Sequence, residues 1–209
     1  MPSPETILIV AMAGLALSAT PGPSMLYVLS RSVGQSRAAG LASAIGLGLG
    51  GIILAVVAAM GLAAVFQRST TAYTVLTVAG AAYLIYLGVT MIVEQRNAHR
   101  DDFNVSAVEQ RSLLQIIWQG VLVEILNPKT VIFFMAFIPP FVEMERGDVT
   151  LQLLILGILV PLTAMPSDIF VAFVGGSVAG AVKRNGAIRV ALGVLGGVFL
   201  IGIGISLFF

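Results

Sequence analysis

Residues 113–142, LLQIIWQGVLVEILNPKTVIFFMAFIPPFV, form an apolar segment that Asn127-Pro128-Lys129 interrupts near its middle. About 18 or more consecutive apolar residues predict a transmembrane helix, and an internal proline breaks or kinks that helix. Thr20-Pro21-Gly22-Pro23 interrupts the apolar segment 6–29 at a similar depth. The two segments predict a membrane-embedded helical bundle in which two of the spans are broken.

The composition also indicates an integral membrane protein. Of the 209 residues, 58% are hydrophobic and only 10% are charged, whereas soluble domains carry about 25% charged residues. A net charge of +1, without a basic cluster, gives no reason to expect a nucleic-acid partner. The absence of cysteine excludes disulfides and thiolate metal sites, and no motif of an intramembrane enzyme is present. We therefore expect neither enzymatic activity nor a cofactor.

Six apolar segments, each long enough to span a bilayer, can be identified. They are residues 6–29, 39–66, 73–93, 113–142, 151–182 and 187–209. Loops one, three and five hold Arg31, Arg37, Arg96, Arg100, Arg111, Lys183, Arg184 and Arg189. Loops two and four hold only Arg68 and Arg146. Because cytoplasmic loops carry the excess of Lys and Arg, both termini are predicted to be periplasmic.

The two broken segments are the first and the fourth, so three segments form each half of a single transmembrane domain. We expect an all-α fold of two three-helix repeats, residues 1–93 and 113–209, joined by a cytoplasmic loop at 94–112. An odd number of spans in each repeat inverts the second repeat relative to the first. Matching broken helices in two inverted repeats indicate the central site of a transporter.

Each break is expected to start a half-helix at mid-membrane. Asn127 with Pro128, and Thr20 with Pro21, are typical of an N-cap followed by a first-turn proline. The free N–H groups of the two starts would form a cradle for an anion such as a carboxylate. The alternative is a proline kink that neighbouring helices relieve, without a ligand.

Three ionisable residues lie inside apolar segments, where each costs about 2.5–3.5 kcal/mol to insert. Lys129 opposes the dipole of its half-helix, and either an acidic partner or an anionic substrate would relieve that conflict. Asp168 and Glu124 are candidates for proton coupling or amine binding, with Asp168 slightly favoured. The alternatives are an ion pair or a helix clamp that only fixes packing.

Glycines recur at four-residue spacing, as in Gly46 with Gly50 and Gly176 with Gly180. Such pairs let helices approach closely, either within the chain or in a homodimer.

The sequence resembles the LysE/RhtB family of amino-acid exporters over nearly its whole length. In the first half, the likeness lies in Thr20-Pro21-Gly22-Pro23 and in Gly80-Ala81-Ala82-Tyr83-Leu84-Ile85-Tyr86-Leu87-Gly88. In the second half, Asn127-Pro128-Lys129 is followed by Phe133-Phe134 and Pro139-Pro140-Phe141. The chain departs from some relatives at Gly51, where those relatives carry an acid.

This resemblance implies a bacterial inner-membrane exporter of amino acids or close derivatives, driven by proton exchange. The expected substrate-binding residues are Thr20, Pro21, Gly22, Pro23, Asn127, Pro128 and Lys129. A divalent-cation exporter of related architecture is the main alternative, but hard cations need several converging oxygen ligands and Lys129 would repel them. The amino acid, the proton stoichiometry and the oligomeric state are left open.

Overall fold

The computed structural model describes residues 1–18, 22–66, 70–97 and 109–184. Near the C-terminus it describes 194–195, 197–198, 200–202 and 204–206. The regular structure of these residues is helical, which confirms the predicted all-α class for this part of the chain. The helices are α1 (Pro4–Ser18), α2 (Pro23–Gly34), α3 (Arg37–Phe66), α4 (Thr70–Asn97), α5 (Leu113–Ile125), α6 (Pro128–Phe137) and α7 (Val149–Arg184), with the 3₁₀ turns η1 (Pro139–Phe141) and η2 (Met144–Arg146).

Among the described residues, up to four parts of the bundle are long and apolar enough to cross a membrane, if each bent pair of helices counts as one span. Two are uninterrupted, Arg37–Leu62 of α3 and Val149–Gly175 of α7. The other two are bent pairs, in which α1 meets α2 at 56° and α5 meets Lys129–Phe141 at 53°. α4 contains a shorter apolar stretch, Ala81–Thr90. The six-span arrangement as a whole therefore stays a prediction.

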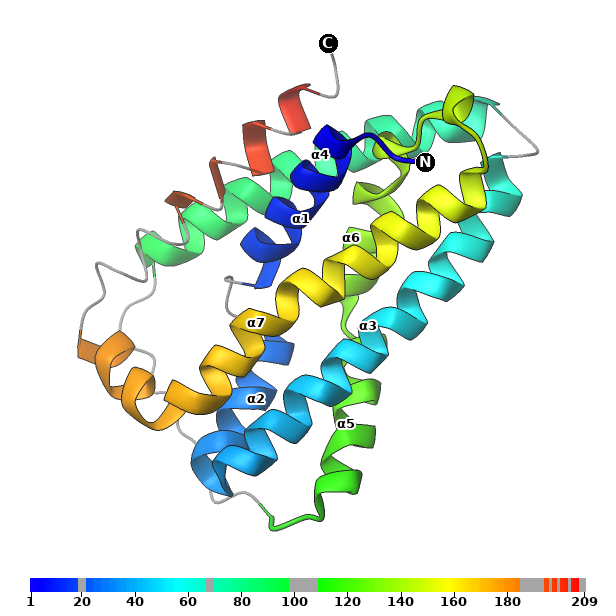
Figure 1. Ribbon diagram of the computed structural model, residues 1–209. Coiled ribbons are helices and arrows are strands. Elements are labelled where there is room, and N and C mark those ends of the chain that lie inside the picture. Colours follow the sequence, from blue (N-terminus) through cyan, green and yellow to red (C-terminus); the bar gives the residue numbers. More distant parts are fainter. Residues whose placement is uncertain are drawn as a thin grey trace.

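The two broken spans run in opposite directions through the molecule (Figure 1). α1 packs against α7, and α5 packs against α3. This exchange of partners is what an inverted repeat would produce, because the first half of each broken span then contacts a helix of the other repeat. Whether all six segments obey that symmetry stays a prediction.

Helix α2 begins two residues later than the sequence predicts. Gly22 is the N-cap, with an extended backbone, and Pro23 is in the first turn, so the assignment of Thr20 and Pro21 to those positions was wrong. A residue that precedes proline is disfavoured in helical geometry, and this keeps Gly22 out of the helix. At the second break the prediction is confirmed, since Asn127 is the N-cap of α6 and Pro128 follows it.

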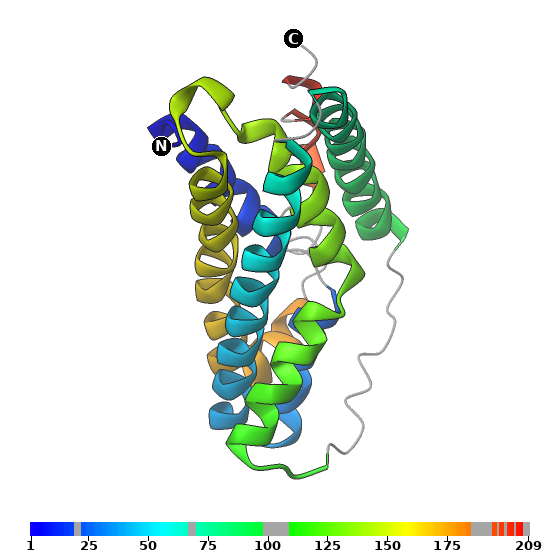
Figure 2. The same ribbon diagram turned by 90° about the vertical axis from the view of Figure 1, so that its right-hand side faces the viewer.

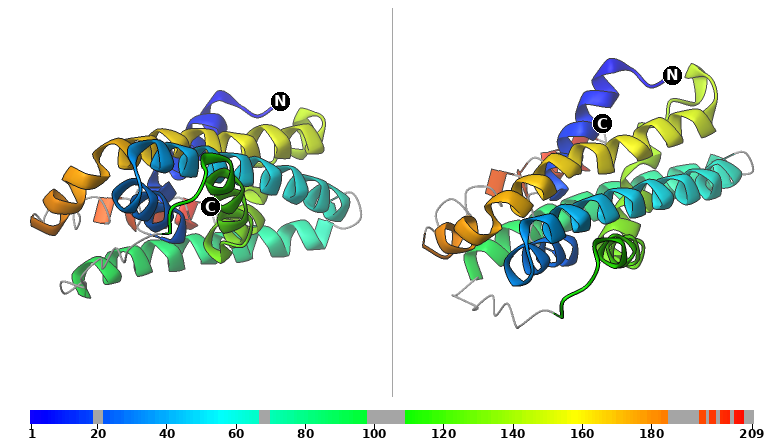
Figure 3. Two further views of the ribbon diagram at one scale, coloured as in Figure 1. Left: turned by 90° about the horizontal axis from the view of Figure 1, so that it is seen from below. Right: turned by 60° about the horizontal axis from the view of Figure 1, so that its bottom comes forward.

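Helix α3 lies along both α7 and α5 (Figures 1 and 3). A side chain at Gly46 would collide with the carbonyl oxygen of Ile117, and Gly120 of α5 lies opposite Gly46. At Gly50 an added Cβ would lie 2.8 Å from Cβ of Glu124. The predicted close approach at Gly46 and Gly50 is thus confirmed within the chain, whereas a homodimer stays a prediction.

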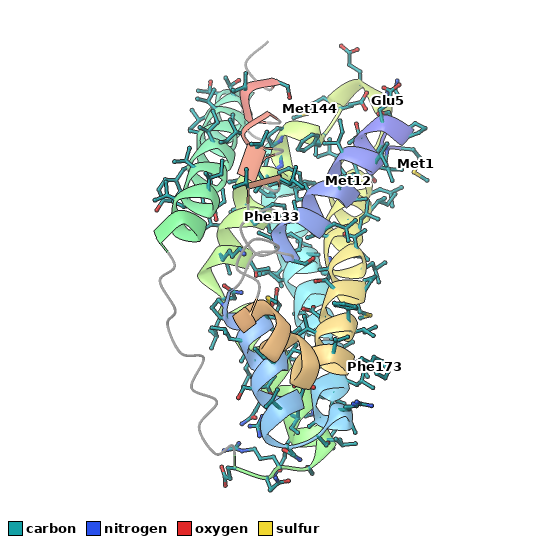
Figure 4. The ribbon with its side chains drawn as sticks, turned by 90° about the vertical axis from the view of Figure 1, so that its left-hand side faces the viewer. Met1, Glu5, Met12, Phe133, Met144 and Phe173 are labelled. Atoms are coloured by element: carbon teal, nitrogen blue, oxygen red, sulfur yellow. The ribbon has the colours of Figure 1, made fainter. Side chains whose placement is uncertain are left out.

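The largest buried cluster joins α1, α3, α6 and α7. Phe133 and Phe137 stack with ring centroids 4.4 Å apart, and Phe141 continues the column at 4.8 Å. Met1 and Met144 lie at one end of the molecule, and Phe173 lies toward the other (Figure 4). We call the first the Met1 end and the second the opposite end. The starts of α3 and α5 also lie at the opposite end (Figure 2).

Helix α4 extends to Asn97 and so takes in the first residues of the expected 94–112 loop.

Candidate functional site

A cavity of about 60 Å³ lies where the two broken spans meet. By that measure it has room for a few water molecules, at about 10–15 Å³ each. The end of α1, the starts of α2 and α6, the end of α5 and the middles of α3 and α7 all contribute to it. Its polar and charged lining consists of Ser18, Ser24, Glu124, Asn127, Lys129, Thr130 and Asp168.

Asn127 links the two breaks to each other. Its side-chain oxygen accepts a hydrogen bond from the Lys129 backbone N–H at 3.1 Å, which caps α6. Its amide nitrogen donates to Oγ of Ser24, in the first turn of α2, at 2.9 Å. The starts of the two half-helices therefore touch directly.

Glu124, in the last turn of α5, accepts hydrogen bonds on both of its carboxyl oxygens. Ser24 Oγ donates to one oxygen at 2.5 Å, and Thr130 Oγ1 donates to the other at 2.9 Å. These contacts join α5 to the starts of α2 and α6, so Glu124 has a well-defined position in the cavity wall.

Lys129 extends from the start of α6 to the end of α1. Its Nζ donates to the carbonyl oxygen of Leu17 at 3.2 Å. The last carbonyls of a helix carry a partial negative charge, so the end of α1 offsets the unfavourable position of Lys129 on its own helix. The Lys129 charge also acts on Glu124 across the cavity.

Asp168 faces the same cavity from α7, beyond the internal prolines Pro161 and Pro166. It lies close enough to Glu124 for the two carboxylates to repel each other when both are ionised. No hydrogen-bond partner for its side chain is found among the described residues. In this respect Asp168 differs from Glu124, both of whose oxygens accept hydrogen bonds.

The first turn of α2 adds backbone donors to the site. Gly22, its N-cap, makes no side-chain capping bond. The N–H groups of Ser24 and Met25 precede the first intrahelical bond, which Leu26 makes to Gly22. These two residues line the cavity, so an anion there would meet uncapped amides.

The structure brings most of the residues predicted for the site together. Gly22, Asn127, Lys129, Glu124 and Asp168 line one cavity. Their roles in binding and proton coupling stay predictions.

The other predicted site residues are not placed in this lining. Pro23 is exposed and does not line the cavity, and Pro128 starts α6, but its side chain is not among those described. Thr20 and Pro21 lie outside the described residues.

Sequence reasoning missed Ser24, Thr130 and Leu17. Ser24 and Thr130 each fall in the first turn after a predicted break, which is the signal that could have identified them. The contact with Leu17 follows from the other consequence of a break, because the helix that ends there exposes its carbonyl groups.

Toward the opposite end, a buried arginine fastens α2 to the chain before α5. Arg31 is 7% exposed and donates to the carbonyl of Glu109 and to Oε1 of Gln119, both at 2.8 Å. Tyr27, one turn nearer the cavity, donates to the carbonyl of Ile116 at 2.8 Å. These contacts join α2 to α5 and to the residues before it on that side of the cavity.

Broken apolar spans that meet around a cavity with charged walls are typical of membrane transport proteins. In agreement with this, residues 15–209 match the family model of the LysE type translocator, and the chain belongs to that family.

Several bacterial membrane proteins are similar in sequence. An uncharacterized membrane protein of Pseudomonas aeruginosa is 30% identical over 90% of this chain and 87% of its own length. A homoserine/homoserine lactone efflux protein of Salmonella typhimurium is 33% identical over 68% of this chain and 66% of its own. A leucine efflux protein of Enterobacter is 26% identical over 79% and 77%, respectively. No solved structure matches the chain.

Proposed function

We propose that this protein exports amino acids or close derivatives across the bacterial inner membrane in exchange for protons. The observation that carries the proposal is the charge arrangement of the cavity, with Lys129 and uncapped α2 amides beside Asp168 and Glu124. An amino acid carries a carboxylate and an ammonium group on one carbon, so it needs both kinds of partner within a few ångströms. The efflux proteins among the relatives, for homoserine and for leucine, support the same substrate class.

The substrate carboxylate is assigned to the start of α2 and to Lys129. Ser24 and Met25 line the cavity, and their N–H groups precede the first intrahelical bond of α2 and have no capping side chain from Gly22. Lys129 lines the same cavity, and one group that its Nζ contacts is the neutral carbonyl of Leu17. A carboxylate would gain charge-assisted hydrogen bonds from these donors.

The substrate ammonium is assigned to Asp168, whose side chain has no hydrogen-bond partner in the described structure. Glu124 is less suited to this role, since Ser24 and Thr130 already engage both of its oxygens.

Proton exchange then follows from competition for a single group. The Asp168 carboxyl holds either a proton or the substrate ammonium, and the two states exclude each other. Substrate that binds from the cytoplasm releases the proton, and a periplasmic proton displaces the substrate. This scheme is an antiport that needs no residue beyond those of the cavity.

Efflux measurements on cells that overproduce the protein test this proposal. Cells preloaded with labelled amino acids should export one or more of them. Lys129→Met and Asp168→Asn should abolish that export, whereas Asp148→Asn should retain it. Asp148 is an exposed acid at the start of α7 that caps the N–H groups of Thr150 and Leu151, and asparagine caps equally well.

Export that survives both cavity substitutions would refute the assigned roles. Failure of the wild-type protein to export any amino acid would refute the proposed function itself.

A further inference from the structure

A second internal space continues the cavity toward the Met1 end of the molecule. It is apolar and too narrow to hold a water molecule. It is lined by three alanines of α3 and Gly157 of α7 together with larger residues, namely Ala55, Ala58, Ala59 and Leu62 of α3, Leu153 of α7, and Phe134 and Ile138. We call it the apolar gap.

Phe134 belongs to the walls of both spaces. Thr130, Phe134 and Ile138 follow one another at four-residue intervals, which places them on one face of α6. Thr130 lines the cavity, Ile138 lines the apolar gap, and Phe134 lies between them. The ring of Phe134 is therefore the partition that separates the two spaces.

On α3 and α7 too, a residue of the cavity wall lies one turn away from a residue of the apolar gap. On α3, Gly51 lines the cavity and Ala55, one turn farther, lines the gap. On α7, Pro161 lines the cavity and Gly157 lines the gap, four residues away. The gap is thus a direct extension of the cavity, and Phe134 blocks the way into it.

Half of the residues that line the apolar gap are small. Three alanines and a glycine line the gap beside Leu62 and Leu153, and a Cβ at Gly157 would lie 3.1 Å from Cβ of Ala55 and 3.6 Å from Cε1 of Phe134. The gap itself holds no space of water size, so the 1% exposed ring of Phe134 is the group whose removal would create space there.

We infer that Phe134 is a specificity-determining residue that sets the upper size of the substrate side chain. The inference rests on the proposed function. With the carboxylate at the start of α2 and the ammonium at Asp168, the apolar wall formed by Leu17, Phe134 and Val160 is left for the side chain. The wild-type site then takes short, uncharged side chains, and removal of the ring opens the apolar gap to longer ones.

Transport by purified variants in liposomes tests the inference. Vesicles loaded with labelled alanine, leucine or phenylalanine are compared for initial efflux under an imposed pH gradient. Phe134→Ala and the milder Phe134→Leu should raise the leucine-to-alanine rate ratio about tenfold or more, since one methylene in an apolar pocket changes specificity by about 10- to 200-fold. Phe133→Leu is the matched control, because Phe133 is 0% exposed and lines neither space.

A second substitution tests the gap itself. Gly157→Ala places a methyl group in the gap, tightly against Ala55, and Gly157 is not part of the cavity wall. Combined with Phe134→Leu, it should bring the ratio back toward the wild-type value.

An unchanged ratio in Phe134→Leu protein that still transports alanine would overturn the inference, as would an equal rise in Phe133→Leu. Wild-type liposomes that transport none of the three amino acids would also overturn the inference, whereas the proposed function fails only if the efflux measurements on cells find no exported amino acid.

Discussion

Substitution of Asn127 by alanine should destabilise the protein by about 1.5–2 kcal/mol. Asn127 is 4% exposed and makes two separate contacts, the cap on Lys129 N–H and the bond to Ser24 Oγ. Loss of an N-cap costs about 1 kcal/mol, and an interhelical polar bond in a membrane contributes about 0.6 kcal/mol on average. Asn127→Ser should retain the cap and lose only the contact between the breaks, so its cost should be well under half as large.

Both variants can be compared by titration of the folded protein with denaturing detergent in mixed micelles, with helix content as the signal. Equal stability of Asn127→Ala and wild type would show that the contact between the breaks contributes little. Equal losses for the alanine and serine variants would refute the separation into a cap and a link between the broken spans.

Two further predictions concern the packing around the site. Gly46→Val should destabilise the protein by about 1–3 kcal/mol through overpacking, since the new side chain meets the backbone of α5. Gly61→Ala on the same helix meets nothing within 4 Å and should be tolerated. Detergent titration of the two variants would show the difference. Arg31→Gln should lower the free energy of unfolding by about 2 kcal/mol, because it leaves the Glu109 carbonyl and Gln119 without their charged donor. Arg37→Gln, an exposed change in the same predicted loop, should alter it by no more than about 0.5 kcal/mol. Equal effects of the two changes would contradict the buried contact.

The features that sequence analysis predicted correctly are local ones. The Asn127-Pro128 cap depends on two neighbouring residues, and the broken apolar segment shows where it must lie. The first break was placed two residues early because Pro21 and Pro23 compete for the first turn, and only the extended geometry of Gly22 decides between them.

The features that could not be predicted join residues that are distant in the chain. The Leu17 carbonyl and Nζ of Lys129 are 112 residues apart in sequence, and no periodicity indicates their contact. Similarly, glycine spacing predicted that Gly46 and Gly50 would contact another helix, but not that this helix is α5. The partition at Phe134 depends on three helices together, and within α6 alone that residue is only one of several buried aromatics.

The central claim is that an amino acid binds between the two broken spans, and site-directed thiol labelling tests it most directly. The natural chain has no cysteine, so a cysteine at Ala164 in the cavity wall would be the sole target. We predict that an exported amino acid slows labelling of Ala164→Cys. Its methyl ester, which lacks the carboxylate, should not slow it. Labelling of the exposed control Gln110→Cys should be unaffected by either compound. Labelling of Ala164→Cys at the same rate with and without an amino acid that the protein exports would contradict it.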